Sequence, residues 1–157
     1  NQKNMTDYDM ALSPGRTYKY YDSTPGAALF SFGHGLSLTE FKLTCSDETA
    51  DTSTKVTCQV ANVGEMDGDE VVLVYHKVSD EIREAADHPI PLKQLIDFER
   101  VGPVAKGAKA FRSFAFTYDD FELVNANGDK VLYDGEHTLV FSRGHGEEVE
   151  LTYVVGH

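Results

Sequence analysis

The sequence predicts an all-β protein, a sandwich of two antiparallel sheets preceded by an extended N-terminal arm. From residue 41 onward the chain consists of short segments in which apolar and polar residues alternate, and turn-forming residues separate these segments. Alternation with a period of two is typical of strands that bury one face. No segment has a convincing helical period, and residues 1–40 follow neither period.

Two alternating segments open the expected sandwich, residues 41–45 and 56–61, and the polar stretch between them suits a hairpin loop. Residues 70–76 form a more continuous apolar run, which predicts a central strand. Turns that contain Gly, Pro, Asn or Asp separate the other expected strands. These are residues 94–101, 110–118, 130–133, 137–142 and 148–155.

Seven or eight short strands separated by turns predict a Greek-key sandwich of the immunoglobulin or fibronectin-III type. The chain contains no Trp, so the Cys-Trp-Cys core of antibody domains is absent and the fibronectin-III-like variety is favoured. Residues 79–91 interrupt the pattern as a long charged loop, in which a short helical turn is expected at residues 81–86.

Residues 1–40 are rich in Tyr, Pro, Gly and Ser, and they also carry many large aromatic side chains. A free linker does not need such side chains, whereas a packed segment does. They fit two interpretations, packing on the chain's own sandwich or packing on another protein surface, and both stay open. The residues concerned are Tyr8, Tyr18, Tyr20, Tyr21, Phe30 and Phe32.

The formal net charge of −12 makes two kinds of partner poor candidates, nucleic acid and anionic membrane, because the average surface repels phosphate groups. The charge does not argue against neutral ligands such as sugars. No apolar run reaches the roughly 20 residues that span a bilayer.

No constellation of residues predicts an active site. The six histidines lack the spacing of a metal site, so we expect no metal site, no cofactor-binding residues and no catalytic residues. Residues 125–129 could be read as a calcium loop, but a hairpin turn fits them better. The acidic residues cluster where solvated turns are expected, and these clusters are Asp67, Asp69 and Glu70; Asp119 and Asp120; and Glu147, Glu148 and Glu150.

Cys45 and Cys58 are the only two cysteines, and both fall on the core-facing side of adjacent strands. A hairpin centred near residues 51–52 places them opposite one another, a geometry that permits a disulfide. Two buried free thiols are the alternative. Asn4 begins an N-glycosylation sequon, a triplet that also arises by chance.

Four stretches resemble one known family. Residues 30–41, FSFGHGLSLTEF, closely resemble the FPFGHGLSYTTF signature at the start of the C-terminal domain of family 3 glycoside hydrolases. Residues 14–21, PGRTYKYY, are similar to the PGRTYRFY stretch of the β-xylosidase branch. Residues 62–72, NVGEMDGDEVV, resemble the family's NTGxxxGDEVV, and residues 91–101, PLKQLIDFERV, its PxKxLxGFERV. The matches follow the family's order.

The resemblance implies an exo-acting hydrolase, a β-xylosidase or β-glucosidase, that removes terminal sugars with retention through a covalent glycosyl intermediate. In that family both catalytic carboxylates lie in upstream domains, and no residue here matches their motifs. Residues 41–157 would then be a fibronectin type III-like accessory domain, and residues 1–40 a linker from the end of a preceding α/β domain. The secretion that this implies favours the disulfide between Cys45 and Cys58.

The function expected from the resemblance is structural: the chain docks on the catalytic domains of its parent glycosidase and stabilises them. Two alternatives stay open. The chain could be a carbohydrate- or cell-wall-binding module in which Tyr18, Tyr20, Tyr21 or Tyr75 stacks on sugar rings, or one chain of a proteolytically processed glycosidase. The expected interdomain contacts are Arg16, Tyr18, Tyr20, Phe32, His34 and Arg100.

Overall fold

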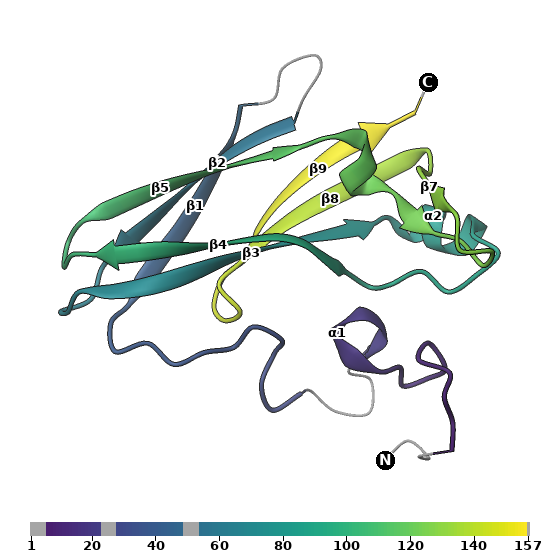
Figure 1. The fold of residues 1–157 in the computed structure, drawn as a ribbon, viewed down its shortest axis with the longest axis horizontal. Helices are drawn as coiled ribbons and strands as arrows, with labels where there is room; N and C mark the ends of the chain where they lie inside the picture. The colour runs from purple at the N-terminus through teal and green to yellow at the C-terminus, as the bar shows by residue number, and fades with distance from the viewer. Residues whose placement is uncertain (1–5, 23–27, 49–53, 157) are drawn as a thin grey trace.

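The computed structural model describes residues 6–22, 28–48 and 54–156. Two antiparallel sheets face one another (Figure 1). One sheet has three strands in the order β1-β2-β5, and the other has four in the order β4-β3-β8-β9. The predicted all-β sandwich is therefore confirmed.

The nine strands of the described residues are β1 (Phe41–Asp47), β2 (Thr54–Asn62), β3 (Gly68–Val78), β4 (Gln94–Val104), β5 (Lys109–Phe116), β6 (Leu123–Val124), β7 (Lys130–Val131), β8 (Gly135–Ser142) and β9 (Val149–Val155). The helices are short: α1 (Thr17–Tyr20), α2 (Asp80–Ala85) and a 3-10 turn at Tyr118–Phe121.

Local turn chemistry causes the departures from the predicted strands. The strand expected to run to residue 118 ends at Phe116, because Thr117 and Asp120 cap the 3-10 turn that follows. The strand expected at residues 130–133 is only the two-residue β7, which forms a hairpin with β6. The predicted hairpin turn in this place is confirmed, since the side chain of Asn125 accepts hydrogen bonds from the amides of Asn127 and Asp129. The helical turn expected at residues 81–86 is α2, one residue earlier.

The core lies between the two sheets, where inward-facing side chains of both meet. The alternation predicted for β2 is seen in its burial, since Val56, Cys58 and Val60 are fully buried. From the other strands Phe114 and Phe141 meet them, with ring centroids 5.7 Å apart. Burial of such apolar area is the main stabilising contribution to a sandwich of this kind.

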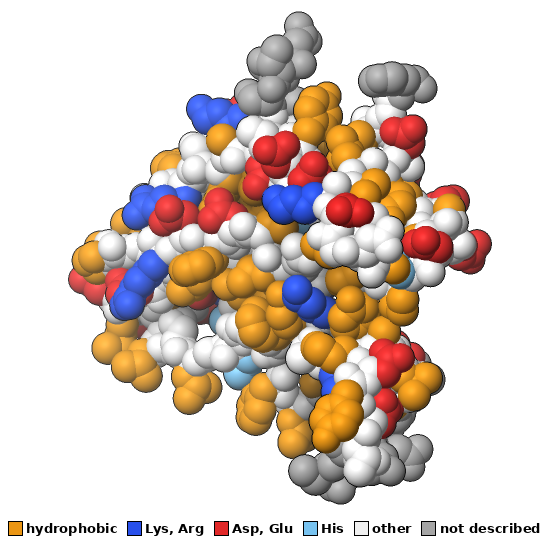
Figure 2. Space-filling view, turned by 45° about the vertical axis from the view of Figure 1, so that its right-hand side comes forward, with side chains coloured by type: hydrophobic (Ala, Val, Ile, Leu, Met, Phe, Trp, Pro, Cys, Tyr) orange, Lys and Arg blue, Asp and Glu red, His pale blue; other side chains and the backbone are white. Residues whose placement is uncertain are grey.

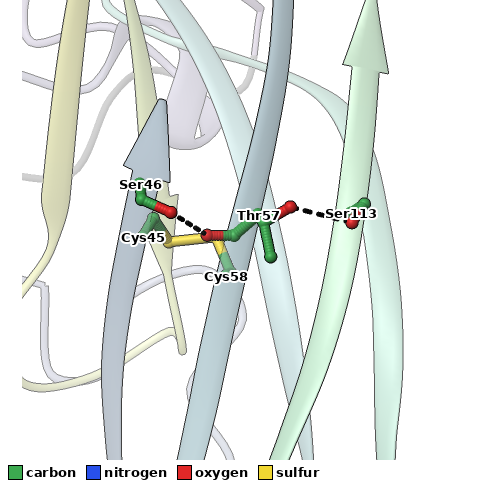
Figure 3. Close-up of a disulfide and its surroundings, with 5 residues drawn as sticks. All are labelled: Cys45, Ser46, Thr57, Cys58 and Ser113. Carbon is green, nitrogen blue, oxygen red and sulfur yellow. Dashed lines mark hydrogen bonds between the residues drawn. A yellow bond between two sulfur atoms is a disulfide. The ribbon is translucent and has the colours of Figure 1, made fainter. Parts of the chain in front are cut away.

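A disulfide joins β1 to β2 (Figure 3). Cys45 and Cys58 are directly opposite one another in the antiparallel register, with their Cα atoms 4.0 Å apart. Outward-facing hydroxyl groups continue the cross-strand contacts, because Ser46 donates to the carbonyl of Thr57 and the Thr57 hydroxyl pairs with that of Ser113 on β5. The three strands are thus tied together next to the disulfide.

Strand β3 is buried on both faces, as its continuous apolar run predicts. It lies between β4 and β8, and Val72 and Val74 point into the core. Leu73 and Tyr75 point to the other face, where they form a separate cluster with Tyr18 of the arm. The described residues of the arm, 6–22 and 28–40, run along this outer face of the four-stranded sheet (Figure 1).

Two histidines on neighbouring strands are fully buried and hydrogen-bonded to each other. His76 on β3 and His137 on β8 are 2% and 0% exposed, and their ring nitrogens lie 2.9 Å apart. His137 Nε2 donates to the carbonyl of Tyr133, so its Nδ1 is the acceptor for the proton on His76 Nε2. Burial lowers the pKa of His76 to about 4, with proximity to His137 as a second cause, and burial also lowers the pKa of His137. Both rings are therefore neutral near pH 7.

Candidate functional site

An aromatic cluster holds the arm against the four-stranded sheet. The ring of Tyr18 stacks on Phe32 with centroids 4.2 Å apart, and its edge faces Tyr75 at 5.8 Å. Tyr18 accepts a hydrogen bond from the amide of Leu95, and Tyr75 donates one to the carbonyl of Phe32. Burial raises the pKa of Tyr75 to about 12, which keeps the phenol protonated and able to donate. The cluster explains why part of the arm's aromatic content packs on the chain's own sandwich.

A second anchor is a crossing of two Gly-His-Gly turns, one from the arm and one between β8 and β9. Gly33 and Gly144 both have positive φ, +84° and +77°, and a Cβ on Gly144 would lie 2.0 Å from the carbonyl oxygen of Gly33. Only glycine permits this backbone approach. The turns bring the rings of His34 and His145 to 5.8 Å.

Beside this crossing lies a hollow of about 190 Å³ that contains two ion pairs. Arg143 pairs with Glu70 at 3.3 Å, and their side chains are only 12% and 10% exposed. On the rim, Nε and Nη2 of Arg100 both donate to one carboxylate oxygen of Asp69. The lining residues are Gly33, Gly35, Leu36, Ser37, Asp69, Glu70, Val71, Arg100, Arg143 and His145.

Another hollow, of about 640 Å³, opens on the arm itself. It is lined by Thr17, Tyr18, Tyr21, Ala28, Phe30, Ser31, Phe32 and Lys93. Phe30 is 71% exposed here, and Lys93 lies over the face of the Tyr75 ring at 4.4 Å. An aromatic wall with hydroxyl and ammonium groups beside it can bind apolar or sugar surfaces.

The arm also presents eight large apolar side chains to solvent among the described residues. Leu36 and Leu38 are 98% and 87% exposed, and Leu29 is 93% exposed. Figure 2 shows hydrophobic side chains projecting along the lower edge of the molecule. The full set is Tyr8, Met10, Leu12, Leu29, Phe30, Phe32, Leu36 and Leu38. We call this set the apolar arm surface.

The predicted contact residues lie in four different places. Tyr18 and Phe32 belong to the aromatic cluster, whereas His34 lies in the turn crossing and Arg100 lines the hollow beside it. Arg16 instead folds the arm, because its guanidinium donates to the carbonyl of Asp7 and its amide to that of Met10. Tyr20 is half-buried beside α2, and burial raises its pKa. Asn4 lies outside the described residues.

Two expectations need correction. Glu70, grouped from sequence with solvated acidic turns, is buried, because β3 carries it inward to Arg143. Tyr75 was one candidate for stacking on a sugar, but it is only 1% exposed, so its ring is not accessible to a ligand.

Sequence reasoning did not identify Glu70, Arg143 and His145 as site residues. One signal was present, a second Gly-His-Gly triplet at residues 144–146 that repeats residues 33–35. Among the described residues, no group of three or more His, Cys, Asp or Glu side chains could hold a metal ion. None of the described helices is long and apolar enough to cross a membrane.

Comparison with curated proteins finds that the chain matches one region of longer proteins, exo-1,4-β-xylosidases. It is 30% identical over 180 residues to the probable exo-1,4-β-xylosidase bxlB of Aspergillus fumigatus, a match that covers 99% of this chain and 22% of that protein. It is 27% identical over 162 residues to exo-1,4-β-xylosidase xlnD of Emericella nidulans, covering 88% of this chain and 19% of that protein. The chain thus spans about a fifth of these relatives.

Solved structures of β-glucosidases contain the same fold in part of their chains. The β-glucosidase of Kluyveromyces marxianus in complex with glucose superposes with a TM-score of 0.75 at 25% identity, over 89% of this chain and 17% of that one. The β-glucosidase EmGH1 of Erythrobacter marinus gives a TM-score of 0.70 at 26% identity, over 88% and 18%. No protein-family model matches the chain.

Proposed function

We propose that this chain is a non-catalytic, fibronectin type III-like domain of a secreted family 3 glycoside hydrolase of the β-xylosidase or β-glucosidase kind. In this proposal residues 41–157 are the domain, and the arm docks on the catalytic part of the same polypeptide and stabilises it. The observation that carries the proposal is the apolar arm surface. Large exposed apolar side chains gathered on one segment indicate a surface that another protein covers.

Three further observations support the proposal. The first two strands of the sandwich, β1 and β2, belong to the three-stranded sheet, whereas in constant-type immunoglobulin domains the first two strands belong to the four-stranded sheet. The chain spans about a fifth of the xylosidases that it matches, which leaves room for catalytic domains elsewhere in the parent protein. The disulfide suits an oxidising compartment, which supports secretion.

The non-catalytic part of the proposal is tested with the purified chain and a chromogenic xyloside. We expect no turnover by the chain and turnover by the longer polypeptide that carries it. Turnover by the purified chain alone would contradict the proposal.

Docking is tested by making the arm polar. The double substitution Leu36→Ser and Leu38→Ser removes two exposed side chains, so it should leave the stability of the isolated chain unchanged. In the longer polypeptide the same change should cost about 1–3 kcal/mol, because there both side chains are buried. Phe111→Ser is the matched control, since Phe111 is 57% exposed on the three-stranded sheet. Equal thermal stability of the double variant and wild-type longer polypeptide would contradict docking.

Carbohydrate binding is a second candidate, favoured by the aromatic hollow that Tyr21, Phe30 and Phe32 line. Calorimetric titration of the isolated chain with xylan and glucan oligomers tests it. Binding heat that Tyr21→Ala abolishes would support this candidate, and no heat would count against it.

A further inference from the structure

Two side chains that line the hollow beside the turn crossing each carry a buried nitrogen without a hydrogen-bond partner in the part of the chain that the structure describes. Arg143 Nη1 donates to Glu70 and lies 3.4 Å from His145 Nε2. Because a guanidinium only donates, His145 Nε2 is the acceptor in this contact, which assigns the imidazole proton to Nδ1. His145 Nδ1 and Arg143 Nε are both buried and have no hydrogen-bond partner among the described residues. Buried N–H donors without a hydrogen-bond partner are rare in folded proteins, so an acceptor from outside the chain is expected for each of them.

The charges at the hollow indicate what kind of acceptor fits. The guanidinium groups of Arg143 and Arg100 are already paired with the carboxylates of Glu70 and Asp69. A further carboxylate would meet no unpaired cation here, whereas a neutral carbonyl oxygen adds no charge and can accept from two donors. Sugars need ring-stacking surfaces as well as donors, and Phe, Tyr and Trp are absent from the residues that line this hollow.

The position of the hollow indicates where that carbonyl comes from. Gly35 and Leu36 line the hollow, and Leu36 also belongs to the apolar arm surface. A partner that covers Leu36 therefore also covers the mouth of the hollow. The inference rests on the proposed function in this one respect, since it takes the covering partner to be the catalytic part of the same polypeptide.

We infer that this hollow is a socket for a carbonyl group of the catalytic part, either a backbone carbonyl or the side-chain amide of Asn or Gln, held by Arg143 Nε and His145 Nδ1. Glu70 keeps the guanidinium in place, and the crossing of Gly33 with Gly144 keeps the two turns together. The socket fixes the orientation of the docked domain, because a buried hydrogen bond has a narrower geometry than apolar contact.

Hydrogen–deuterium exchange of residues 143–146 tests the socket in the isolated chain and in the longer polypeptide. We expect exchange in this turn to be about fivefold slower, or more, in the longer polypeptide. Arg143→Lys retains the positive charge for Glu70 but lacks the Nε donor, and His145→Phe retains the ring without a donor. Both variants should return the turn to the exchange rate of the isolated chain. Arg112→Lys, at a half-buried arginine on β5, should not.

The outcomes separate the socket from docking itself. Protection of residues 28–38 without protection of the turn would overturn the socket and leave docking intact. No protection of either segment would overturn both. Protection of the turn in the isolated chain by millimolar xylobiose would also overturn the socket, because it would identify a sugar site. The first two outcomes need only the two wild-type proteins, and the third needs only the isolated chain with and without xylobiose.

Discussion

The sandwich and the arm place their large apolar side chains in opposite ways. In the sandwich Phe141 and Tyr75 are 0% and 1% exposed, and both are covered by other parts of the same chain. In the arm Leu36 and Leu38 are almost fully exposed, although they belong to a segment that glycine contacts and an aromatic cluster hold in place. A segment that is positioned so specifically and yet leaves its apolar side chains uncovered is suited to pack on a second surface.

This contrast separates two roles that the arm's aromatic residues could have. Tyr18 and Phe32 fasten the arm, because they pack on Tyr75 and Leu95. Phe30 and the exposed leucines contribute little to the stability of the chain by itself, since they gain little burial from it. Substitutions in the two regions should therefore have effects of very different size.

The largest expected effect comes from the core. Phe141→Ala should destabilise the isolated chain by about 3–5 kcal/mol, because it removes a ring that packs against Phe114 and Phe116. Phe30→Ala is the matched control in the arm and should change the free energy of unfolding by less than about 0.5 kcal/mol. Urea unfolding of the two variants measures both values. Similar losses would contradict the contrast between the two regions.

The disulfide should have the next largest effect. Replacing Cys45 and Cys58 together with Ser should lower the free energy of unfolding by about 3 kcal/mol, because the bond closes a loop between residues that are 13 positions apart in the sequence. Thermal unfolding of the double variant and of the wild type with and without reductant measures this. The arm should be protected from protease equally in both proteins, and faster cleavage of the arm in the variant would show that the two regions are coupled.

Acid should destabilise the sandwich through the buried histidines. Unfolded His76 takes up a proton near its ordinary pKa of 6.5, whereas the folded chain resists protonation until about pH 4. The unfolded state therefore binds more protons between these values, and the free energy of unfolding falls as the pH falls. The loss between pH 7 and pH 4 should be on the order of 2 kcal/mol.

Unfolding of His76→Phe across the same pH range separates the histidine effect from that of the carboxylates. This variant should have a shallower pH dependence than the wild type, while His34→Gln, at an exposed histidine, should leave the slope unchanged. An unchanged slope for His76→Phe would show that the buried pair does not govern acid sensitivity.

The smallest effect tests how the arm is fastened. Gly144→Ala and Gly107→Ala introduce a side chain at nearly the same backbone φ, +77° and +74°. Only the first meets a neighbour, the backbone of Gly33, because nothing lies within 4 Å of the second. Gly107→Ala should cost about 1 kcal/mol, and Gly144→Ala about 2 kcal/mol. Limited proteolysis should cleave the arm faster in Gly144→Ala alone.

Much of the sandwich could be predicted from the sequence because strand burial leaves a period of two. The alternation in β2 and the continuous apolar run of β3 both correspond to observed burial. The register of the first hairpin followed from the same pattern, with Cys45 opposite Cys58. The predicted ends of the strands that became β5 and β7 were wrong. Side-chain caps and short turns determine where these strands end, and they leave no periodic pattern of apolar residues in the sequence.

The hollow could not be predicted because its residues come from four separate segments. Glu70 follows two acidic residues in a turn-like stretch, and only the register of β3 shows that it points inward. The repeated Gly-His-Gly triplet is a signal for His145, but it does not show that the backbone of Gly33 crosses that of Gly144, far away in the chain. Contacts of this kind depend on how the arm crosses the finished sheet.

Thiol labelling at the apolar arm surface tests the central claim most directly. Leu36→Cys places a thiol at a side chain that is 98% exposed, and Phe111→Cys places one at a control position on the other sheet. In the isolated chain a maleimide should react quickly with both. In the longer polypeptide reaction at position 36 should slow by about tenfold or more, while reaction at position 111 stays fast. Equal labelling of position 36 in the two proteins would contradict the claim that the arm docks on the rest of its polypeptide.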